Sequence, residues 1–230
     1  MKQEELKHLD VKPVQPKDVI PFSCRLCGDC CRNVENSVML DAFDAYRLGQ
    51  YLREKTSMVS TIEDVFSWFT HPQALENGYP VFVLNTCGEH HACTFLEQDR
   101  CSVYDARPRV CRLYPFTVFT GGRGRNFAYF QCMDRNMAHF SPVYGERVSV
   151  EDWFYQNFSK DDRAYFLAEA KALPELGRLI RAMGPKAQRD RLFQILYYRY
   201  FNFDLGKPFL EQYQENQKAL MEELQAATGR

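Results

Sequence analysis

The stretch "FSCRLCGDCCR", residues 22–32, concentrates four cysteines in eight positions, and any fold for this chain has to accommodate them. Cys24, Cys27 and Cys30 form a C-x2-C-x2-C series, and Cys31 follows directly. A disulfide framework, a structural metal site and a redox centre all use closely spaced thiols. The sequence on either side of this loop bears on which of them the cysteines serve.

The N-terminus and the cysteine count disfavour the disulfide alternative. Residues 1–22 contain no apolar segment of the kind found in secretory signals, which predicts a cytoplasmic location. A reducing compartment keeps cysteines as thiols or metal ligands. The chain has nine cysteines, so a purely disulfide-bonded framework would leave one of them unpaired.

Composition limits the class of protein. With 230 residues, 45% of them hydrophobic, the chain is long enough to bury the core of one domain with an appendage. A net charge of −1 argues against nucleic-acid binding, which depends on a basic surface. The apolar runs are too short for a transmembrane helix, so we expect no membrane partner. A protein or peptide substrate or partner remains as the expectation, and the sequence does not indicate the oligomeric state.

Three regions follow one another along the chain. Residues 1–20 carry Pro13 and Pro16 and little apolar periodicity, which predicts an extended N-terminal arm. Residues 21–140 form a cysteine-rich, metal-binding region, and residues 141–230 form a helical region packed on it. The predicted fold is therefore α+β and mainly helical, with a small cysteine-rich core and a β-hairpin.

Local signals place the elements of the first two regions. Asp41 is the predicted cap of one helix, and Ser60 with Glu63 forms the predicted capping box of the next. The apolar run "PVFVLN", residues 80–85, predicts a strand. Two aromatic and β-branched runs around "GGRG" predict a hairpin over residues 116–131.

The sequence of the C-terminal region predicts a series of helices. Ser149 and Ser159 are predicted caps, Pro174 is predicted in the first turn of a helix, and Gly184-Pro185 is a predicted stop. The last helix carries an apolar face made of Phe209, Leu210, Tyr213, Leu220, Met221 and Leu224. No cysteine follows Cys132, so the chemistry is expected between residues 22 and 132.

A second group of cysteines follows the first loop and consists of Cys87, Cys93, Cys101, Cys111 and Cys132. A structural zinc site usually pairs two C-x2-C knuckles, and this chain has no second knuckle. Ferredoxin-type loops use the C-x2-C-x2-C spacing, although their further cysteine is followed directly by proline. The spacing favours iron, held as an iron–sulfur cluster, with zinc as the alternative.

The adjacent pair Cys30 and Cys31 raises a geometric question. Neighbouring side chains point apart in extended and in helical backbone, so the two thiols are not expected to serve one ion. They would serve two metals, or one of them would be buried or reactive instead.

Basic side chains accompany the second group of cysteines. His90 and His91 are candidate zinc or iron ligands, or residues of a solvated loop. Arg107 and Arg112 flank Cys111 and would offset the negative charge of a thiolate-bound cluster. In the alternative, Arg107 only ends a strand and pairs with a nearby aspartate.

The motifs "FSCRLCGDCCR", "CTFLEQDRCSVYDARPRVCRLYPF" and "YFQC" closely resemble the YkgJ-type cysteine-cluster family, the CxxCxxCC zinc- or iron-chelating domain. The resemblance covers about residues 20–135, and Cys87 lies outside the family pattern. Flagellin lysine N-methylases carry a similar cluster. By this resemblance the metal-binding positions are Cys24, Cys27, Cys30, Cys31, Cys93, Cys101, Cys111 and Cys132.

Two function classes are consistent with this sequence. In the first, the chain is a metalloenzyme that modifies a protein or peptide side chain, as similarity to the lysine methylases implies. In the second, it is a metal-stabilised binding module whose C-terminal helices engage a protein partner. An iron–sulfur centre with an open coordination position favours the first, and a zinc site closed by four thiolates favours the second.

Overall fold

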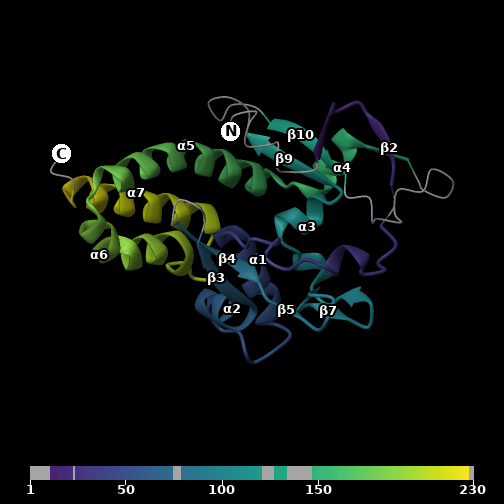
Figure 1. Ribbon diagram of the computed structural model, residues 1–230, viewed down its shortest axis with the longest axis horizontal. Coiled ribbons are helices and arrows are strands. Elements are labelled where there is room, and N and C mark those ends of the chain that lie inside the picture. Colours follow the sequence, from purple (N-terminus) through teal and green to yellow (C-terminus); the bar gives the residue numbers. More distant parts are fainter. Residues whose placement is uncertain (1–10, 23, 75–78, 121–126, 134–146, 228–230) are drawn as a thin grey trace.

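The structure is a computed structural model that describes residues 11–22, 24–74, 79–120, 127–133 and 147–227. Long helices in the C-terminal half follow short antiparallel strands and shorter helices in the N-terminal half (Figure 1). The predicted class, a mainly helical α+β fold, is confirmed.

The N-terminal segment joins two sheets. Strand β1 (Val11–Val14) is the edge of an antiparallel sheet of order β1-β10-β9, in which β9 is Phe116–Thr120 and β10 is Phe127–Cys132. Strand β2 (Val19–Pro21) pairs with β11 (Arg147–Ser149). These two strands hydrogen-bond to the rest of the chain, and residues 1–10 of the predicted arm lie outside the described residues. The edge position of β1 tolerates its proline, because an edge strand needs fewer backbone donors.

The predicted hairpin is confirmed by the antiparallel pairing of β9 with β10, and its loop, 121–126, lies outside the described residues. Helix α4 (Val150–Asn157) packs against this sheet and is capped by Ser149, as predicted. The Phe154 ring lies 4.5 Å from the Tyr129 ring, centroid to centroid. This contact belongs to a buried cluster of Val14, Ile20, Leu113, Phe116, Val118, Val150, Phe154 and Phe158.

Helices α1 (Ala42–Leu52) and α2 (Ile62–Phe69) precede a hairpin of β3 (Thr70–Ala74) and β4 (Pro80–Leu84), where the predicted strand is confirmed. Asp41 caps α1, as predicted, and accepts a hydrogen bond from the amide of Asp44.

The predicted capping box of α2 is wrong by one residue. The box consists of Thr61 and Asp64, not of Ser60 and Glu63. The Asp64 carboxylate accepts from the backbone amides of both Ser60 and Thr61, each at 2.8 Å, so the helix begins one residue later.

Short elements carry most of the cysteines. They are η1 (Asp29–Cys31), β5 (Thr86–Cys87), β6 (Ala92–Cys93), β7 (Leu96–Glu97), β8 (Arg100–Cys101), η2 (Tyr104–Ala106) and α3 (Arg109–Leu113). β5 pairs with β6 and β7 with β8, which gives two small hairpins in succession. Elements this short bury little apolar surface, so they depend on their neighbours for stability.

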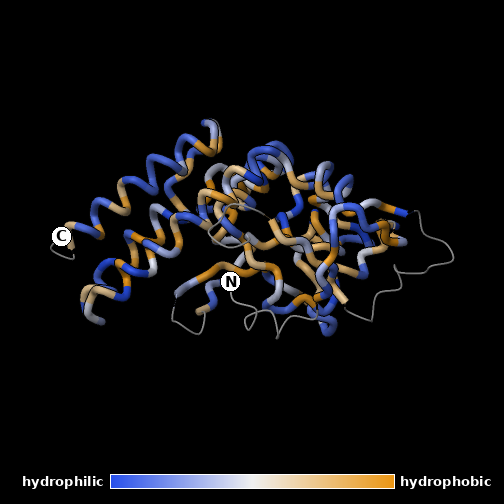
Figure 2. Tube along the Cα trace, turned by 90° about the horizontal axis from the view of Figure 1, so that it is seen from above, coloured by the Kyte–Doolittle hydropathy of each residue, from blue (hydrophilic) through white to orange (hydrophobic). Residues whose placement is uncertain are grey.

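The C-terminal helices lie together at one end of the molecule (Figure 1). They are α5 (Lys160–Ala182), α6 (Pro185–Leu196), the π-helical turn η4 (Tyr197–Phe201) and α7 (Phe209–Ala227). Ser159 caps α5, and the stop at Gly184-Pro185 is confirmed, since Pro185 begins α6. Figure 2 shows hydrophilic and hydrophobic turns alternating along these helices.

The predicted position of Pro174 is wrong. It lies inside α5 instead of in the first turn of a helix. A proline inside a helix costs about 3 kcal/mol, because it removes a backbone donor and clashes with the preceding turn. Leu176 and Leu179 follow it and are buried in a cluster with Met183, Ile195, Leu220 and Leu224. We attribute the continuous helix to this burial.

The largest hydrophobic cluster joins the two halves of the chain. It combines Phe43, Phe66 and Phe82 with Tyr200 and Phe209 from the C-terminal region. The cysteine-bearing elements pack against this cluster, so the C-terminal region supports them. Across the described ranges, no helix has the length and apolar composition needed to cross a membrane.

The helical end offers a direct test of its packing. Leu220→Ala is expected to lower the free energy of unfolding by about 2–5 kcal/mol, because Leu220 is fully buried and truncation leaves a cavity. Alanine favours helix, so the loss reports packing alone. Leu173→Ala is the matched control at a leucine that is 45% exposed, and its expected effect is within about 0.5 kcal/mol. Denaturant titration measures both, and equal losses would contradict the assigned core.

Candidate metal centre

The first cysteine loop is fastened to the hairpins that carry the second group of cysteines. The backbone amide of Asn33 donates to the His90 carbonyl at 2.8 Å, and the amide of Val34 donates to the His91 carbonyl at 3.2 Å. Arg32 forms an ion pair with Asp99 in the turn between β7 and β8. The loop and the hairpins therefore lie side by side, although about 60 residues separate them in sequence.

Thiols from the two segments meet on one side of the main hydrophobic cluster. Cys93 is buried within the cluster, and Cys31, Cys101 and Cys111 pack against it. η1 supplies Cys31, the two hairpins supply Cys93 and Cys101, and α3 supplies Cys111. The prediction that the two cysteine segments meet in space is confirmed.

The thiols are close enough to affect one another's protonation. Burial, followed by the charges of Cys93 and Cys30, raises the pKa of Cys111. Burial also raises the pKa values of Cys93 and Cys101. Without a cation, these thiols stay protonated at neutral pH. A bound metal reverses this preference, because thiolates are the ligands that metals take.

Cys30 and Cys31 lie together in the tight turn of η1 and influence each other's protonation. The interaction with Cys31 lowers the pKa of Cys30 to about 7, and the same interaction together with burial raises the pKa of Cys31. Gly28 starts that turn with a φ of 71°. Regular helix or strand geometry, on which the predicted divergence of the two thiols rests, does not apply in such a turn.

Tyr104 and Arg107 form a polar edge beside the thiols. The Tyr104 hydroxyl donates to Cys24 Sγ at 3.6 Å, and the Arg107 guanidinium lies 3.6 Å from the centre of the Tyr104 ring. The Arg107 charge acts to lower the pKa values of Cys30 and Cys101. Its predicted proximity to the thiols is thereby observed. The sequence interpretation missed Tyr104, although it lies in the quoted "CSVYDARP" segment.

Arg112 directs its guanidinium elsewhere. Nη1 and Nη2 donate to the two carboxylate oxygens of Asp162, at 2.9 and 2.7 Å, and Nε donates to the Arg107 carbonyl. Asp162 lies in the first turn of α5, so this pair joins α3 to the C-terminal helices. A role for Arg112 in offsetting the charge of a cluster stays a prediction.

The other candidate residues are distributed over the first loop, β10 and the hairpin of β5 and β6. Cys27 is half-buried in the first loop, and Cys132 ends β10, where its amide donates to the Pro115 carbonyl at 2.8 Å. Cys87 and His90 are exposed, and His91 Nδ1 lies 3.7 Å from a carboxylate oxygen of Glu35. The Glu35 contact places His91 on the outside of the hairpin turn.

The thiols share one region without converging on a single point. Among the described residues, no three histidine, cysteine, aspartate or glutamate side chains are arranged to hold one metal ion. The donor set nevertheless fits the soft thiolate chemistry of zinc and of iron–sulfur centres. Because side chains rotate easily and metal binding is coupled to folding in small sites, ligation itself is expected to close the geometry.

Gly28 allows a test of the first loop. A Cβ atom there would lie 2.6 Å from Leu96 Cδ1 and 2.7 Å from the Asp99 carbonyl oxygen, at a positive φ of 71°. Gly28→Ala is therefore expected to lower the free energy of unfolding by about 2–4 kcal/mol, from backbone strain together with the clash. Gly88→Ala is the matched control, since its φ is 70° and nothing lies within 4 Å of the added atom. Its expected loss is about 1 kcal/mol, and a loss equal to that of Gly28→Ala would refute the close approach.

Comparison with known proteins supports the interpretation of the cysteines. Residues 23–139 match the family model CxxCxxCC, described as a "Putative zinc- or iron-chelating domain". No curated protein and no solved structure matches the chain, so the similarity to flagellin lysine N-methylases stays a prediction. The matched residues include every thiol that meets in this region and make up more than half of the 230 residues. The chain belongs to the CxxCxxCC family of zinc- or iron-chelating domains.

Proposed function

We propose that the chain is a metal-binding protein that holds iron, as an iron–sulfur cluster, through cysteine thiolates. The proposed ligands are drawn from Cys24, Cys27, Cys30, Cys31, Cys93, Cys101, Cys111 and Cys132. The observation that carries the proposal is the meeting of thiols from η1, from two hairpins and from α3 in one electrostatically coupled group. Separate segments converge in this way when one centre ties them together.

The spacing and setting of the thiols favour a cluster over a single zinc ion. The first loop has the C-x2-C-x2-C spacing of iron–sulfur sites, and the chain has no second C-x2-C knuckle of the kind that completes a structural zinc site. A thiolate-bound cluster carries negative charge, and Arg107 is placed to offset it. Tyr104 donates to Cys24 and would tune the electron density on that sulfur.

The protein's own residues supply binding and orientation. The hydrophobic cluster fixes Cys93 and Cys111, while the loop around Gly28 sets the position of Cys30 and Cys31. When bound, an iron–sulfur centre supplies electron transfer or polarisation of a ligand. In the enzyme form of the proposal, a protein or peptide side chain is the substrate.

A non-catalytic zinc module is the second candidate. Its supporting observation is the exposed apolar surface of α6 and η4, where Phe193 is 82% and Tyr197 is 47% exposed. Exposed aromatic side chains are common in protein-binding surfaces. In this form the metal only holds the fold, and the C-terminal helices engage a protein partner.

Metal and sulfide analysis of anaerobically purified protein separates the two candidates. The cluster form is expected to be brown, with broad visible absorption and roughly equal amounts of iron and acid-labile sulfide, since bridging sulfide accompanies iron. Anaerobic handling matters, because zinc occupies thiolate sites readily once a cluster has been lost. A colourless protein with stoichiometric zinc, and no uptake of iron on reconstitution, would establish the second candidate instead.

A further inference from the structure

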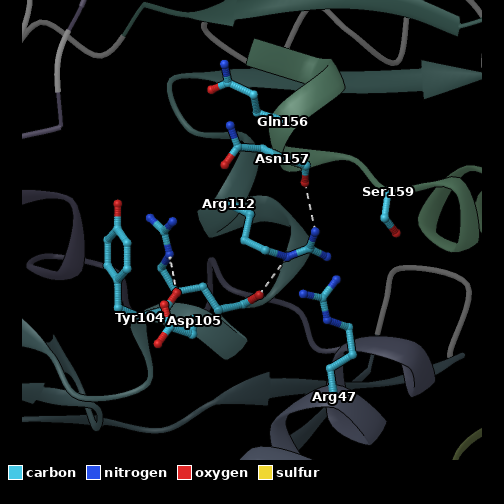
Figure 3. Close-up of a pocket in the computed structure, with 8 residues that line it drawn as sticks. Arg47, Tyr104, Asp105, Arg112, Gln156, Asn157 and Ser159 are labelled. Carbon is cyan, nitrogen blue, oxygen red and sulfur yellow. Dashed lines mark hydrogen bonds between the residues drawn. The ribbon is translucent and has the colours of Figure 1, made fainter. Parts of the chain in front are cut away.

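A cavity of about 220 Å³ is lined by three arginines and by Tyr104, whose hydroxyl donates to Cys24. Arg47 comes from α1, Arg107 follows η2, and Arg112 belongs to α3. Ser159 also lines the cavity (Figure 3). Three guanidinium groups around so small a volume require either internal partners or a ligand, and the three differ in this respect.

Arg112 has its partners within the protein. Besides Asp162 and the Arg107 carbonyl, it donates to the Asn157 carbonyl at 2.8 Å, as the dashed lines in Figure 3 show in part. It is only 6% exposed. Arg112 therefore forms a fixed, neutralised wall of the cavity.

Arg107 is held in place while its terminal groups stay available. Its Nε donates to the Tyr104 carbonyl at 2.8 Å, and its guanidinium stacks on the Tyr104 ring. Within the described ranges, its side-chain hydrogen bonds and ring contact are with Tyr104 alone, and its Nη groups form no ion pair with a carboxylate. A guanidinium fixed by its inner nitrogen presents two parallel donors at low entropic cost, which suits a carboxylate or a phosphate.

Arg47 faces the same space and is only partly neutralised. Its Nη1 lies 3.4 Å from Asp162 Oδ2, which already serves Arg112. Its Nη2 has no partner in the part of the chain that the structure describes. Burial and the charge of Arg112 lower the pKa of Arg47, as expected for a cation that faces another cation.

Carboxylates satisfy the three arginines to different extents. Arg112 is paired with both Asp162 and Asp44, whereas Arg47 shares Asp162 with it at 3.4 Å. The carboxylate that lines the cavity itself is that of Asp105, which is exposed. The volume is below the roughly 300 Å³ from which small-molecule sites usually start. A single anionic group fits this space, and a nucleotide does not.

We propose that this cavity binds one phosphate or carboxylate group through Arg47 and Arg107. A carboxylate is planar and a phosphate is tetrahedral, but both present negatively charged oxygens that accept hydrogen bonds from paired N–H groups. This anion site is separate from the proposed metal site, because its hydrogen-bond donors are arginine side chains and no metal ion takes part in it. Arg107 and Tyr104 connect it to Cys30 and Cys24, so the bound group lies at the edge of the metal centre.

Calorimetric titration of the full-length, metal-loaded protein tests this site, with inorganic phosphate in one series and acetate in the other at constant ionic strength. At least one of these two anions is expected to bind saturably, with one site per chain. Tighter binding of phosphate would indicate a phosphate ligand, and tighter binding of acetate would indicate a carboxylate ligand. Arg47→Gln is expected to weaken binding about tenfold or more, since a charge-assisted hydrogen bond is lost. Arg107→Gln is expected to do the same.

Arg178→Gln is the control, because Arg178 lies on the exposed surface of α5. The anion affinity of this variant should equal that of the unchanged protein. The metal content of each variant is measured in parallel, so that a failure of the metal proposal is recognised separately. Absence of saturable binding by both anions would overturn the anion site, as would Arg47→Gln and Arg107→Gln proteins that bind like the unchanged chain.

Discussion

Cys111→Ser protein is expected to contain little metal and to aggregate at temperatures where the unchanged chain stays folded. Cys111 lies on α3 against the main hydrophobic cluster, where it interacts with Cys93 and Cys30. A serine hydroxyl does not replace a thiolate as a ligand for zinc or iron. Metal-binding free energy is folding free energy in such sites, with apparent values of about 10–16 kcal/mol for structural zinc. The expected effect is therefore larger than that of any packing substitution in this chain.

The measurement is metal per chain together with the melting temperature, after anaerobic purification. Cys87→Ser is the matched control, because Cys87 is exposed and lies outside the family's cysteine pattern. Cys27→Ser is a second variant. Because Cys27 is only half-buried, lost core packing would not explain a fall in the metal content or melting temperature of this variant. If Cys27→Ser and Cys111→Ser both keep full metal content and an unchanged melting temperature, the ligand assignment is wrong.

Local sequence signals predicted much of this fold. Helix caps at Asp41, Ser149 and Ser159 depend on a side chain and an amide three residues away, so spacing alone reveals them. The hairpin of β9 and β10 follows from β-branched and aromatic runs around a glycine-rich turn. The number and positions of the cysteines similarly predicted that the two segments meet in space, and the backbone contacts of Asn33 and Val34 place them side by side.

The errors arise where tertiary contacts outweigh local preference. Pro174 is a helix breaker by local rules, yet the burial of Leu176 and Leu179 just after it carries α5 through this position. The orientation of Cys30 and Cys31 depends on a turn that regular geometry does not describe. The sequence also did not indicate the partner of Arg112, because Asp162 lies 50 positions further along the chain. No local pattern indicates such a pair.

The Arg112–Asp162 pair carries the second large expected effect. Asp162 is 1% exposed, so Arg112→Met leaves a buried carboxylate without its bidentate partner. The expected loss is about 3–5 kcal/mol in the free energy of unfolding, because an uncompensated buried charge costs far more than an exposed one. The same change frees α3 from α5, so the metal content should also fall.

Two further variants show whether the loss belongs to this pair. Asp162→Asn keeps an acceptor for the Ser159 cap but removes the charge, and the double variant with Arg112→Met is expected to lose less than the sum of the single changes. Arg178→Met breaks the exposed pair with Glu175, for which the expected effect is within about 1 kcal/mol. Additive losses at Arg112 and Asp162 would show that the two residues act independently.

The pH dependence of this pair has a definite sign. Burial alone would raise the pKa of Asp162, but the hydrogen bonds and charge of Arg112 outweigh burial and hold that pKa below its ordinary value. A carboxyl whose pKa is lower in the folded state binds its proton more readily when unfolded. The stability it contributes is therefore complete above its unfolded pKa of about 3.9 and is lost as pH falls through the lower folded value. The difference in unfolding free energy between the unchanged chain and Asp162→Asn should stay constant from pH 7 to about 5 and shrink below about 4, because the Asp162 carboxyl is then protonated in the unchanged chain. A difference that grows on acidification would mean that Asp162 is not held as a carboxylate by Arg112.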